Sequence, residues 1–226
     1  MKKTLLTLLV ALATITLCAQ PRETVAILGD SYSTFEGYNT PDTMDMWYFQ
    51  KVDLKRTDVS NVRDTWWWQV VKDGGYKLGI NNSWSGSTIC NTSYNDRDGS
   101  FKSFLRRMDA LGTPDIILIF GGTNDAWAHA PLGEFKYDNI RMADKYFFRP
   151  ALAFLLSHTL DRYPNASLYF ISNSDLDNNY TSSIHTICKY YGVPVIQLHD
   201  VSKQNGHPDK AGMKAIAKQV LAVIKK

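Results

Sequence analysis

The sequence has few of the residues that define a disulfide-stabilised or a nucleic-acid-binding protein. Only three of its 226 residues are cysteine, so the fold does not depend on a disulfide framework. The net charge is +3 and the lysines and arginines are scattered, which makes nucleic acid a poor candidate partner. The chain has no internal repeat, low-complexity tract or linker. These absences favour one domain that is large enough to bury its own core.

Metal-binding patterns are also missing. No set of histidines and cysteines has the spacing of a zinc site. The segment YNDRDGS has two acidic residues before a glycine, but Tyr94 occupies the first ligand position of a calcium loop and no glutamate stands at the twelfth. We therefore expect neither a metal nor another cofactor.

The N-terminus has the pattern of a secretory signal peptide. Two lysines precede an apolar run over residues 4–17, which is too short for a comfortable membrane span, and Ala19 lies at its end. We expect a signal peptide over residues 1–19 and one domain over residues 20–226, in the periplasm or secreted and without stable membrane insertion. Cleavage would leave 207 residues.

Two alternatives remain open for the cysteines. A lipoprotein anchored through Cys18 is possible in principle, although Leu17 stands where a lipid-attachment site favours a small residue. Cys90 and Cys188 would remain in the mature chain, where an oxidising compartment permits a bridge. The sequence does not decide whether they pair, nor does it fix the oligomeric state.

Short apolar runs alternate with helix-like stretches along the chain. Nearly continuous aliphatic and β-branched runs are typical of parallel strands covered on both faces. The predicted strands are 24–29, 76–81, 115–121, 167–172 and 193–198. The predicted helices are 61–72, 101–111, 138–163, 178–191 and 209–224. This order predicts an α/β fold: a three-layer α/β/α sandwich around a five-stranded parallel sheet.

One connection is unusually long. Residues 30–75 separate the first strand from the second, and only part of them looks helical. Long excursions in compact domains usually have a function or are mobile. This one carries Trp47 and the run Trp66, Trp67 and Trp68.

Polar and glycine residues follow several of the predicted strands. Ser31 comes after the first, Gly86 after the second and Asn124 after the third, while His207 precedes the last helix. Ligands of open parallel sheets bind outside the carboxyl ends of the strands. We therefore expect these four residues to meet at one edge of the sheet.

That inventory suits acyl transfer. A serine hydroxyl becomes a useful nucleophile when a base, usually histidine at neutral pH, takes its proton. The tetrahedral intermediate needs fixed donors for its oxyanion. The backbone N–H groups of Ser31 and Gly86 and the side-chain amide of Asn124 could supply three.

Four sequence blocks resemble those of the SGNH (GDSL-type) hydrolase family. They are ILGDSYSTF, SGS around Gly86, GGTND around Asn124 and GHPDKAGM around His207, in the family's order and over nearly the whole mature chain. The resemblance implies a flavodoxin-like sheet and an esterase, lipase, thioesterase or carbohydrate deacetylase. It also implies Ser31 as nucleophile, Gly86 and Asn124 as oxyanion donors, and His207 as base.

The chain departs from the family at one position. The family usually has an aspartate three residues before the histidine, and this chain has Gln204. Either a nearby carbonyl, such as the main-chain carbonyl of Gln204, or the carboxylate of Asp200 could orient the imidazole instead. Asp200 is the candidate orienter among the carboxylates, and both alternatives stay open.

Three tryptophans are candidate substrate contacts. Trp84 lies two residues before Gly86, Trp127 lies three after Asn124, and Trp47 lies in the long connection. Aromatic faces beside an ester-hydrolysing centre suit sugar rings, although core packing is the commoner fate. We predict a secreted serine esterase acting on a small-molecule or glycan ester, most plausibly removing acetyl groups from carbohydrate. The alternatives are a lipase or thioesterase for longer chains, or a glycan-binding domain with impaired catalysis.

Overall fold

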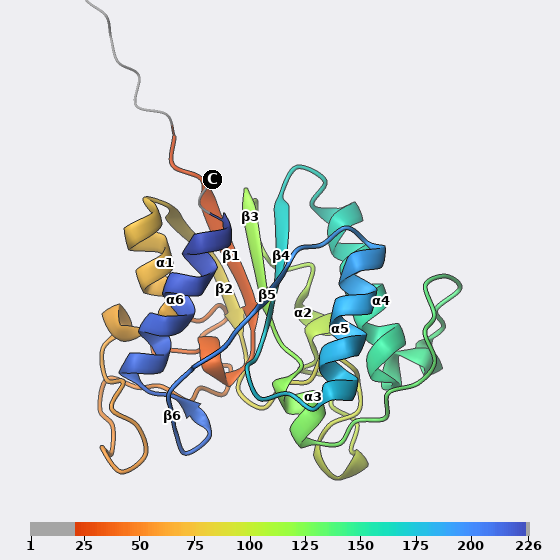
Figure 1. Ribbon diagram of the computed structural model, residues 1–226, viewed down its shortest axis with the longest axis horizontal. Coiled ribbons are helices and arrows are strands. Elements are labelled where there is room, and N and C mark those ends of the chain that lie inside the picture. The colour runs from red at the N-terminus through yellow and green to blue at the C-terminus, as the bar shows by residue number, and fades with distance from the viewer. Residues whose placement is uncertain (1–20, 225–226) are drawn as a thin grey trace, which may run out of the picture.

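Five parallel strands form the central sheet, in the order β2-β1-β3-β4-β5 (Figure 1). The computed structural model describes residues 21–224, so the predicted signal peptide lies outside the described residues. The strands are β1 Thr24–Gly29, β2 Lys77–Ser83, β3 Ile116–Phe120, β4 Ser167–Ser172 and β5 Val195–Gln197. The prediction of a five-stranded parallel sheet is confirmed, and the strand order is that of a flavodoxin-like fold.

Helices cover both faces of this sheet. Helices α1 and α6 lie on one face and α2 to α5 on the other (Figure 1). Their bounds are α1 Trp66–Gly74, α2 Phe104–Arg107, α3 Thr123–Trp127, α4 Phe148–Arg162, α5 Asn178–Tyr190 and α6 Lys210–Ile224. Four 3₁₀ turns are η1 Ser31–Ser33, η2 Val62–Asp64, η3 Tyr94–Asp96 and η4 Met142–Tyr146. The three-layer prediction is confirmed.

The alternation of side chains along β1 divides the core in two. Val25 and Ile27 pack on the side of α1 and α6, whereas Ala26 and Leu28 pack on the side of α4 and α5. All four are fully buried. A strand with two buried faces reads as a continuous apolar run, which is why β1 was recognisable from the sequence.

Three helices are shorter than predicted. The predicted helix 61–72 begins only at Trp66, because residues 62–64 form the 3₁₀ turn η2 and Thr65 caps the helix. The long helix begins at Phe148 rather than at residue 138, because proline is tolerated only in the first turn of a helix and Pro150 therefore fixes its start. Only Phe104–Arg107 of the predicted helix 101–111 is α-helical. The Ser103 hydroxyl donates to the Asn91 side chain at 3.0 Å, and residues 100–103 form a turn instead.

The sheet topology places the ends of three strands together. Strand β1 pairs with β2 on one side and β3 on the other, with Gly29 opposite both Ser83 and Phe120. The loops that carry the predicted site residues therefore start side by side at the carboxyl edge, at the bottom of Figure 1. This is the point where the chain order reverses, the usual ligand site of such sheets.

A small hairpin that the sequence analysis missed precedes α6. Strands β6 Lys203–Gln204 and β7 His207–Pro208 pair antiparallel. The two residues between them, Asn205 and Gly206, have positive φ angles of 50° and 75°. A two-residue turn of this kind favours Asn-Gly because both residues tolerate the left-handed region.

Two further points concern the described residues. Cys90 and Cys188 are free thiols buried in the same half of the core, so they do not form a bridge. None of the helices between residues 21 and 224 combines the length and apolarity that a membrane span requires.

Candidate active site

Ser31 begins the tight turn that follows β1. The Asp30 carboxylate caps this turn by accepting a hydrogen bond from the Tyr32 N–H at 3.0 Å. The core residue Trp66 supports the turn from below, because its indole N–H donates to the Tyr32 carbonyl at 3.1 Å. The Ser31 residue is 3% exposed. Its hydroxyl is therefore held rigidly at the edge of the sheet.

His207 lies against this serine. Its Nε2 atom is 2.9 Å from Ser31 Oγ, across 176 positions of sequence. The other ring nitrogen, Nδ1, is 3.1 Å from the backbone carbonyl of Asn205. A carbonyl only accepts hydrogen bonds, so Nδ1 carries the hydrogen and Nε2 is the free base that accepts the serine proton. The pair has the geometry of a nucleophile and its general base.

The prediction that Asp200 orients this base is wrong. The Asp200 carboxylate lies 2.9 Å from His199 Nδ1, and both side chains are largely exposed. Gln204 does not orient the ring either, because the carbonyl that His207 Nδ1 contacts is that of Asn205, and the Gln204 side-chain amide donates to the Leu54 carbonyl at 2.8 Å. The orienter is a backbone carbonyl, the other alternative considered, but it belongs to Asn205, one residue further along. The tight turn brings that carbonyl back toward the ring.

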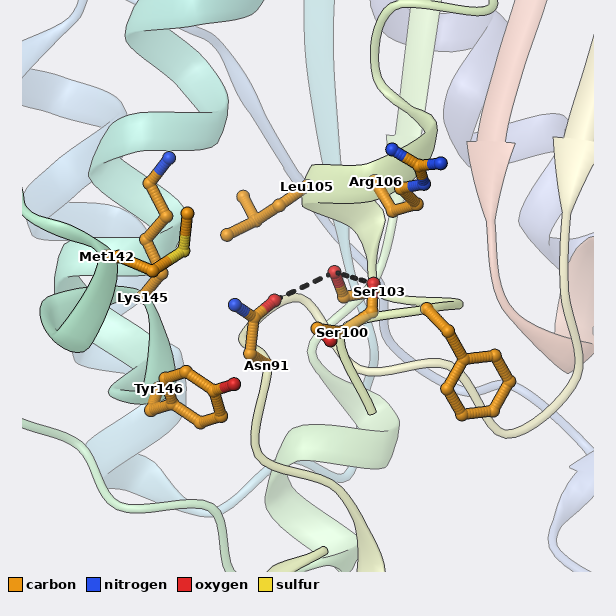
Figure 2. A pocket seen from close by; sticks show the side chains of 9 residues that line it. Asn91, Ser100, Ser103, Leu105, Arg106, Met142, Lys145 and Tyr146 are labelled. Atoms are coloured by element: carbon orange, nitrogen blue, oxygen red, sulfur yellow. Dashed lines mark hydrogen bonds between the residues drawn. The ribbon is translucent and has the colours of Figure 1, made fainter. Parts of the chain in front are cut away.

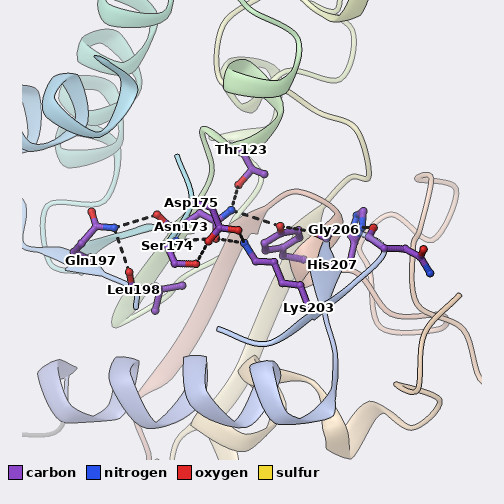
Figure 3. A network of polar contacts seen from close by, with 11 residues as sticks. Thr123, Asn173, Ser174, Asp175, Gln197, Leu198, Lys203, Gly206 and His207 are labelled. Carbon is purple, nitrogen blue, oxygen red and sulfur yellow. Dashed lines mark hydrogen bonds and ion pairs between the residues drawn. The ribbon is translucent and has the colours of Figure 1, made fainter. Parts of the chain in front are cut away.

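The hairpin of β6 and β7, which carries His207, is fixed from two directions. Tyr32, next to the serine, donates its hydroxyl to the Gly206 carbonyl at 2.6 Å. Lys203 reaches Asn173 Oδ1 at 3.0 Å and also pairs with Asp175, both just beyond β4. Figure 3 shows these contacts as one network that runs from the end of β4 to the histidine. The hairpin is therefore tied to the sheet edge as well as to the nucleophile turn.

The long connection holds the other side of the hairpin. Tyr48 donates to the Pro208 carbonyl at 2.7 Å. The Asn205 amide donates to the carbonyls of Lys55 and Arg56 at 2.8 and 3.0 Å. The excursion between β1 and β2 thus packs against the base, which gives its length a structural reason.

Asn124 presents a free donor at the site. Its Oδ1 atom accepts a hydrogen bond from the Tyr94 hydroxyl at 2.6 Å. Its Nδ2 atom is buried and has no partner among the described residues. Buried polar groups in proteins are nearly always paired, so an unpaired amide that is held by its oxygen is a strong sign of a ligand site. Such a donor can receive an oxyanion.

Gly86 is the second residue that was predicted to supply a donor. Its φ angle is +72°, a conformation that a side chain would strain, and no acceptor among the described residues takes its N–H. The loop around it is anchored by the buried Arg107, whose Nη2 donates to Ser87 Oγ at 2.8 Å and to the Gly29 carbonyl at 3.1 Å. Burial lowers the pKa of Arg107 to about 9 and raises that of Asp30 to about 7. This buried cation joins the ends of β1 and β2 beneath the site.

Asp125, next to Asn124, ties two loops of the site together. It accepts hydrogen bonds from the N–H groups of Ile89 and Cys90 at 2.8 and 3.1 Å. Its burial is complete and raises its pKa to about 6. The contact fastens the loop after Gly86 to the start of α3, so that the second and third donors are held relative to each other.

The three predicted tryptophans have different surroundings. Trp127 is 42% exposed and lies edge-on to His207, with ring centroids 5.9 Å apart. Trp47 is stacked flat on His207, at 3.5 Å and 5°. Trp84 bonds Asp45 through its indole N–H at 3.1 Å and meets the edge of Phe101. Only Trp127 combines contact with the base and an exposed ring.

A hollow of about 460 Å³ lies between α2 and η4, and none of the four candidate catalytic residues lines it. Figure 2 shows Leu105 and Arg106 on one side of it and Met142 and Lys145 on the other. Phe101, which also lines it, contacts Trp84 at 5.9 Å between ring centroids. The hollow is therefore linked through two aromatic rings to the loop that carries Gly86.

The arrangement brings together the groups that acyl transfer requires. A nucleophile, a base in the correct tautomer and free oxyanion donors meet at the carboxyl ends of β1, β2 and β3. Across residues 21–224 no three histidine, cysteine, aspartate or glutamate residues form a group that could hold a metal ion.

Sequence reasoning missed three residues of this site. Tyr94 orients Asn124, Asn205 orients His207, and Tyr32 holds the hairpin. The Asn-Gly dipeptide at 205–206 is a recognised hairpin signal and could have revealed the second. No sequence pattern indicates that Tyr94 contacts Asn124, which lies 30 positions further along the chain.

Comparison with known proteins agrees with this geometry. The chain resembles a candidate GDSL-like lipase from Bacteroides ovatus (50% identity, TM-score 0.89, covering 91% of this chain and 99% of that one). A second, from Bacteroides uniformis, has 47% identity and a TM-score of 0.88 over 91% and 97% of the chains. A family two carbohydrate esterase from Clostridium thermocellum, solved with cellohexaose, shares the fold at 18% identity (TM-score 0.60, 92% and 65% coverage). No curated protein matches. The GDSL-like Lipase/Acylhydrolase family matches residues 23–224, and the chain belongs to this family of ester hydrolases.

Proposed function

We propose that this protein is a secreted serine esterase that removes short acyl groups, chiefly acetyl, from carbohydrate. The observation that carries the proposal is the 2.9 Å contact between Ser31 Oγ and His207 Nε2 beside the free amide of Asn124. A serine without a base is a poor nucleophile, and a free hydrogen-bond donor without a nucleophile cannot catalyse acyl transfer. Together they form the minimum set for a tetrahedral intermediate.

The reaction proceeds in two steps. Ser31 Oγ attacks the ester carbonyl carbon while His207 Nε2 takes the hydroxyl proton, and the oxyanion accepts hydrogen bonds from the N–H groups of Ser31, Gly86 and Asn124. The intermediate collapses, the alcohol leaves with the proton from His207, and an acyl-serine remains. Water then attacks the acyl carbon and gives a proton to His207. The second tetrahedral intermediate collapses, the carboxylic acid is released, and Ser31 Oγ takes the proton from His207, which regenerates the serine and the neutral base.

The sugar preference is supported by the leaving-group side of the site. The proton that His207 delivers goes to the departing alcohol, so that alcohol lies next to the histidine and its neighbours. Trp127 is such a neighbour, and its exposed ring offers a face for a sugar. The fold shared with a carbohydrate esterase solved with cellohexaose, and the predicted signal peptide over residues 1–19, agree with a polysaccharide substrate outside the cytoplasm.

The direct test is release of acetate from acetylated oligosaccharides and hydrolysis of p-nitrophenyl acetate. We expect both activities in the wild type and neither in Ser31→Ala. Ser182→Ala is a matched control, since this serine is exposed on α5. Undiminished activity of Ser31→Ala would overturn the mechanism. A fluorophosphonate separates the alternative of a glycan-binding domain without catalysis. It labels Ser31 in an esterase and leaves it unlabelled in such a domain.

A second candidate is an esterase for longer acyl chains. The observation that favours it is the hollow beside Phe101, Leu105 and Met142, which has room for an extended apolar group. A series of p-nitrophenyl esters of increasing chain length separates the two. Highest kcat/KM on acetate supports the deacetylase, and a maximum on longer chains supports the lipase or thioesterase.

A further inference from the structure

The base of this site has no carboxylate partner. The Asn205 carbonyl fixes the tautomer of His207 but carries no charge that could stabilise the imidazolium formed during the reaction. The charged groups that face the ring are cations, Arg56 and Lys203, of which Lys203 is paired with Asp175. Burial, together with these two cations, lowers the pKa of His207 to about 4. Something else must stabilise the protonated ring in the transition state.

The indole of Trp47 is the group in position to do so. It lies parallel to the imidazole, with centroids 3.5 Å apart and planes 5° from parallel. The face of an aromatic ring carries negative electrostatic potential and attracts a cation, most strongly in tryptophan. The Arg56 guanidinium lies 4.1 Å from the same indole ring, so this ring system already attracts one cation.

Trp47 is also fixed relative to the nucleophile. Its backbone N–H donates to Thr34 Oγ1 at 2.9 Å, and that hydroxyl donates to the Ser31 carbonyl at 3.0 Å. A stacked ring that is tied to the serine turn limits the rotation of the imidazole. It therefore holds Nε2 in line with the hydroxyl that it must deprotonate.

Gln204 contributes to the same arrangement. It stands where the family usually has the acid, and its amide binds the Leu54 carbonyl in the segment that carries Trp47 and Arg56. With an amide in place of a carboxylate at position 204, His207 has no negative charge beside it from this position. The same amide fastens the long connection between β1 and β2 over the histidine.

We propose, on the basis of the serine–histidine mechanism above, that Trp47 is the positioning residue of the base. Its indole holds the plane of His207 and stabilises the imidazolium of the transition state through a cation–π interaction, in place of the carboxylate that position 204 lacks.

The first test compares Trp47→Phe with Trp47→Leu. Both side chains cover the histidine with apolar atoms, but only phenylalanine offers a π face, while Arg56 and Lys203 are the same in both variants. We expect kcat on p-nitrophenyl acetate to be roughly tenfold lower in Trp47→Leu than in Trp47→Phe, with similar KM. The acid limb of the kcat/KM profile should lie at lower pH in Trp47→Leu, because the protonated ring has lost its partner. Equal kcat and equal acid limbs would overturn the proposal.

A second test avoids any change of shape. Tryptophans with one, two or three ring fluorines, introduced at position 47 alone, keep the size of the indole and progressively weaken its negative face. We expect log kcat to fall with each fluorine, and a constant kcat would overturn the cation–π role even if the leucine variant is unstable. Ser31→Ala distinguishes the two levels of failure. Activity that survives it refutes the proposed function, whereas activity that needs Ser31 but ignores these changes refutes only the role of Trp47.

Discussion

Replacing Tyr94 by phenylalanine should slow ester hydrolysis while leaving the protein folded. The Tyr94 hydroxyl donates to Asn124 Oδ1 at 2.6 Å, and this bond fixes the rotation of the amide whose buried Nδ2 has no partner among the described residues. Phenylalanine fills the same space but allows the amide to rotate. The oxyanion would then lose a fixed donor and gain a mobile one.

The size of the effect follows from what each group contributes. A typical intramolecular hydrogen bond contributes about 0.5–1.5 kcal/mol net, which corresponds to roughly two- to thirteen-fold in rate. Removing the donor itself, in Asn124→Ala, should cost about 100- to 1000-fold in kcat. Tyr94→Phe should therefore lower kcat by several-fold to about tenfold, and always by less than Asn124→Ala.

The assay is steady-state hydrolysis of p-nitrophenyl acetate by the two single variants and the double variant. Because Tyr94 acts through Asn124, adding Tyr94→Phe to Asn124→Ala should cost nothing more. Tyr191→Phe is the matched control, since its hydroxyl donates to the Tyr137 carbonyl at 3.2 Å on another part of the surface. Additive losses in the double variant, or an unchanged kcat in Tyr94→Phe, would refute this reasoning.

Three further predictions concern the base and the buried cation. Because burial lowers the pKa of His207 to about 4, the neutral base persists in weak acid, and the acid limb of the kcat/KM profile should lie near pH 4; a limb near the ordinary histidine value would contradict this. Arg107→Met leaves the Gly29 and Asn82 carbonyls without their buried donor and should lower the free energy of unfolding in urea by about 3–5 kcal/mol; a loss below about 1 kcal/mol would count against it. Gln204→Asp should not raise kcat, because Nδ1 is already bonded and the amide contact to the long connection is lost; a rise of about tenfold or more would show that the acid can return.

The sheet was predictable because each strand is buried on both faces. The run at β1 was predicted over the same residues, 24–29, that form the strand. The predicted start of α4 at residue 138 is wrong because the fixed φ and missing N–H of Pro150 limit this residue to the first turn of the helix. The hairpin around Asn205 was missed because its strands are two residues long, too short for a periodic pattern.

The residues of the site also fall into those that the sequence predicted and those that it did not. Ser31, Gly86 and Asn124, which follow strands, and His207, which precedes the last helix, could be predicted to meet because parallel strands bring their carboxyl ends to one edge, and the structure brings Ser31 and His207 together there. The groups that position them could not be assigned. Whether Asp200 or a carbonyl faces the imidazole depends on the path of a six-residue hairpin, and two residues of that path lie in the left-handed region.

The sequence by itself therefore determined the layer architecture and predicted a reactive serine, its histidine and two oxyanion donors, because strand burial and residue chemistry are local properties. Tertiary structure alone decided how the base is held. The Asn205 carbonyl, the indole of Trp47 and the hydroxyl of Tyr94 reach their partners only after distant segments have packed. A hydrogen bond or a stacked ring depends on ångström-level placement, and residue order alone does not specify that placement.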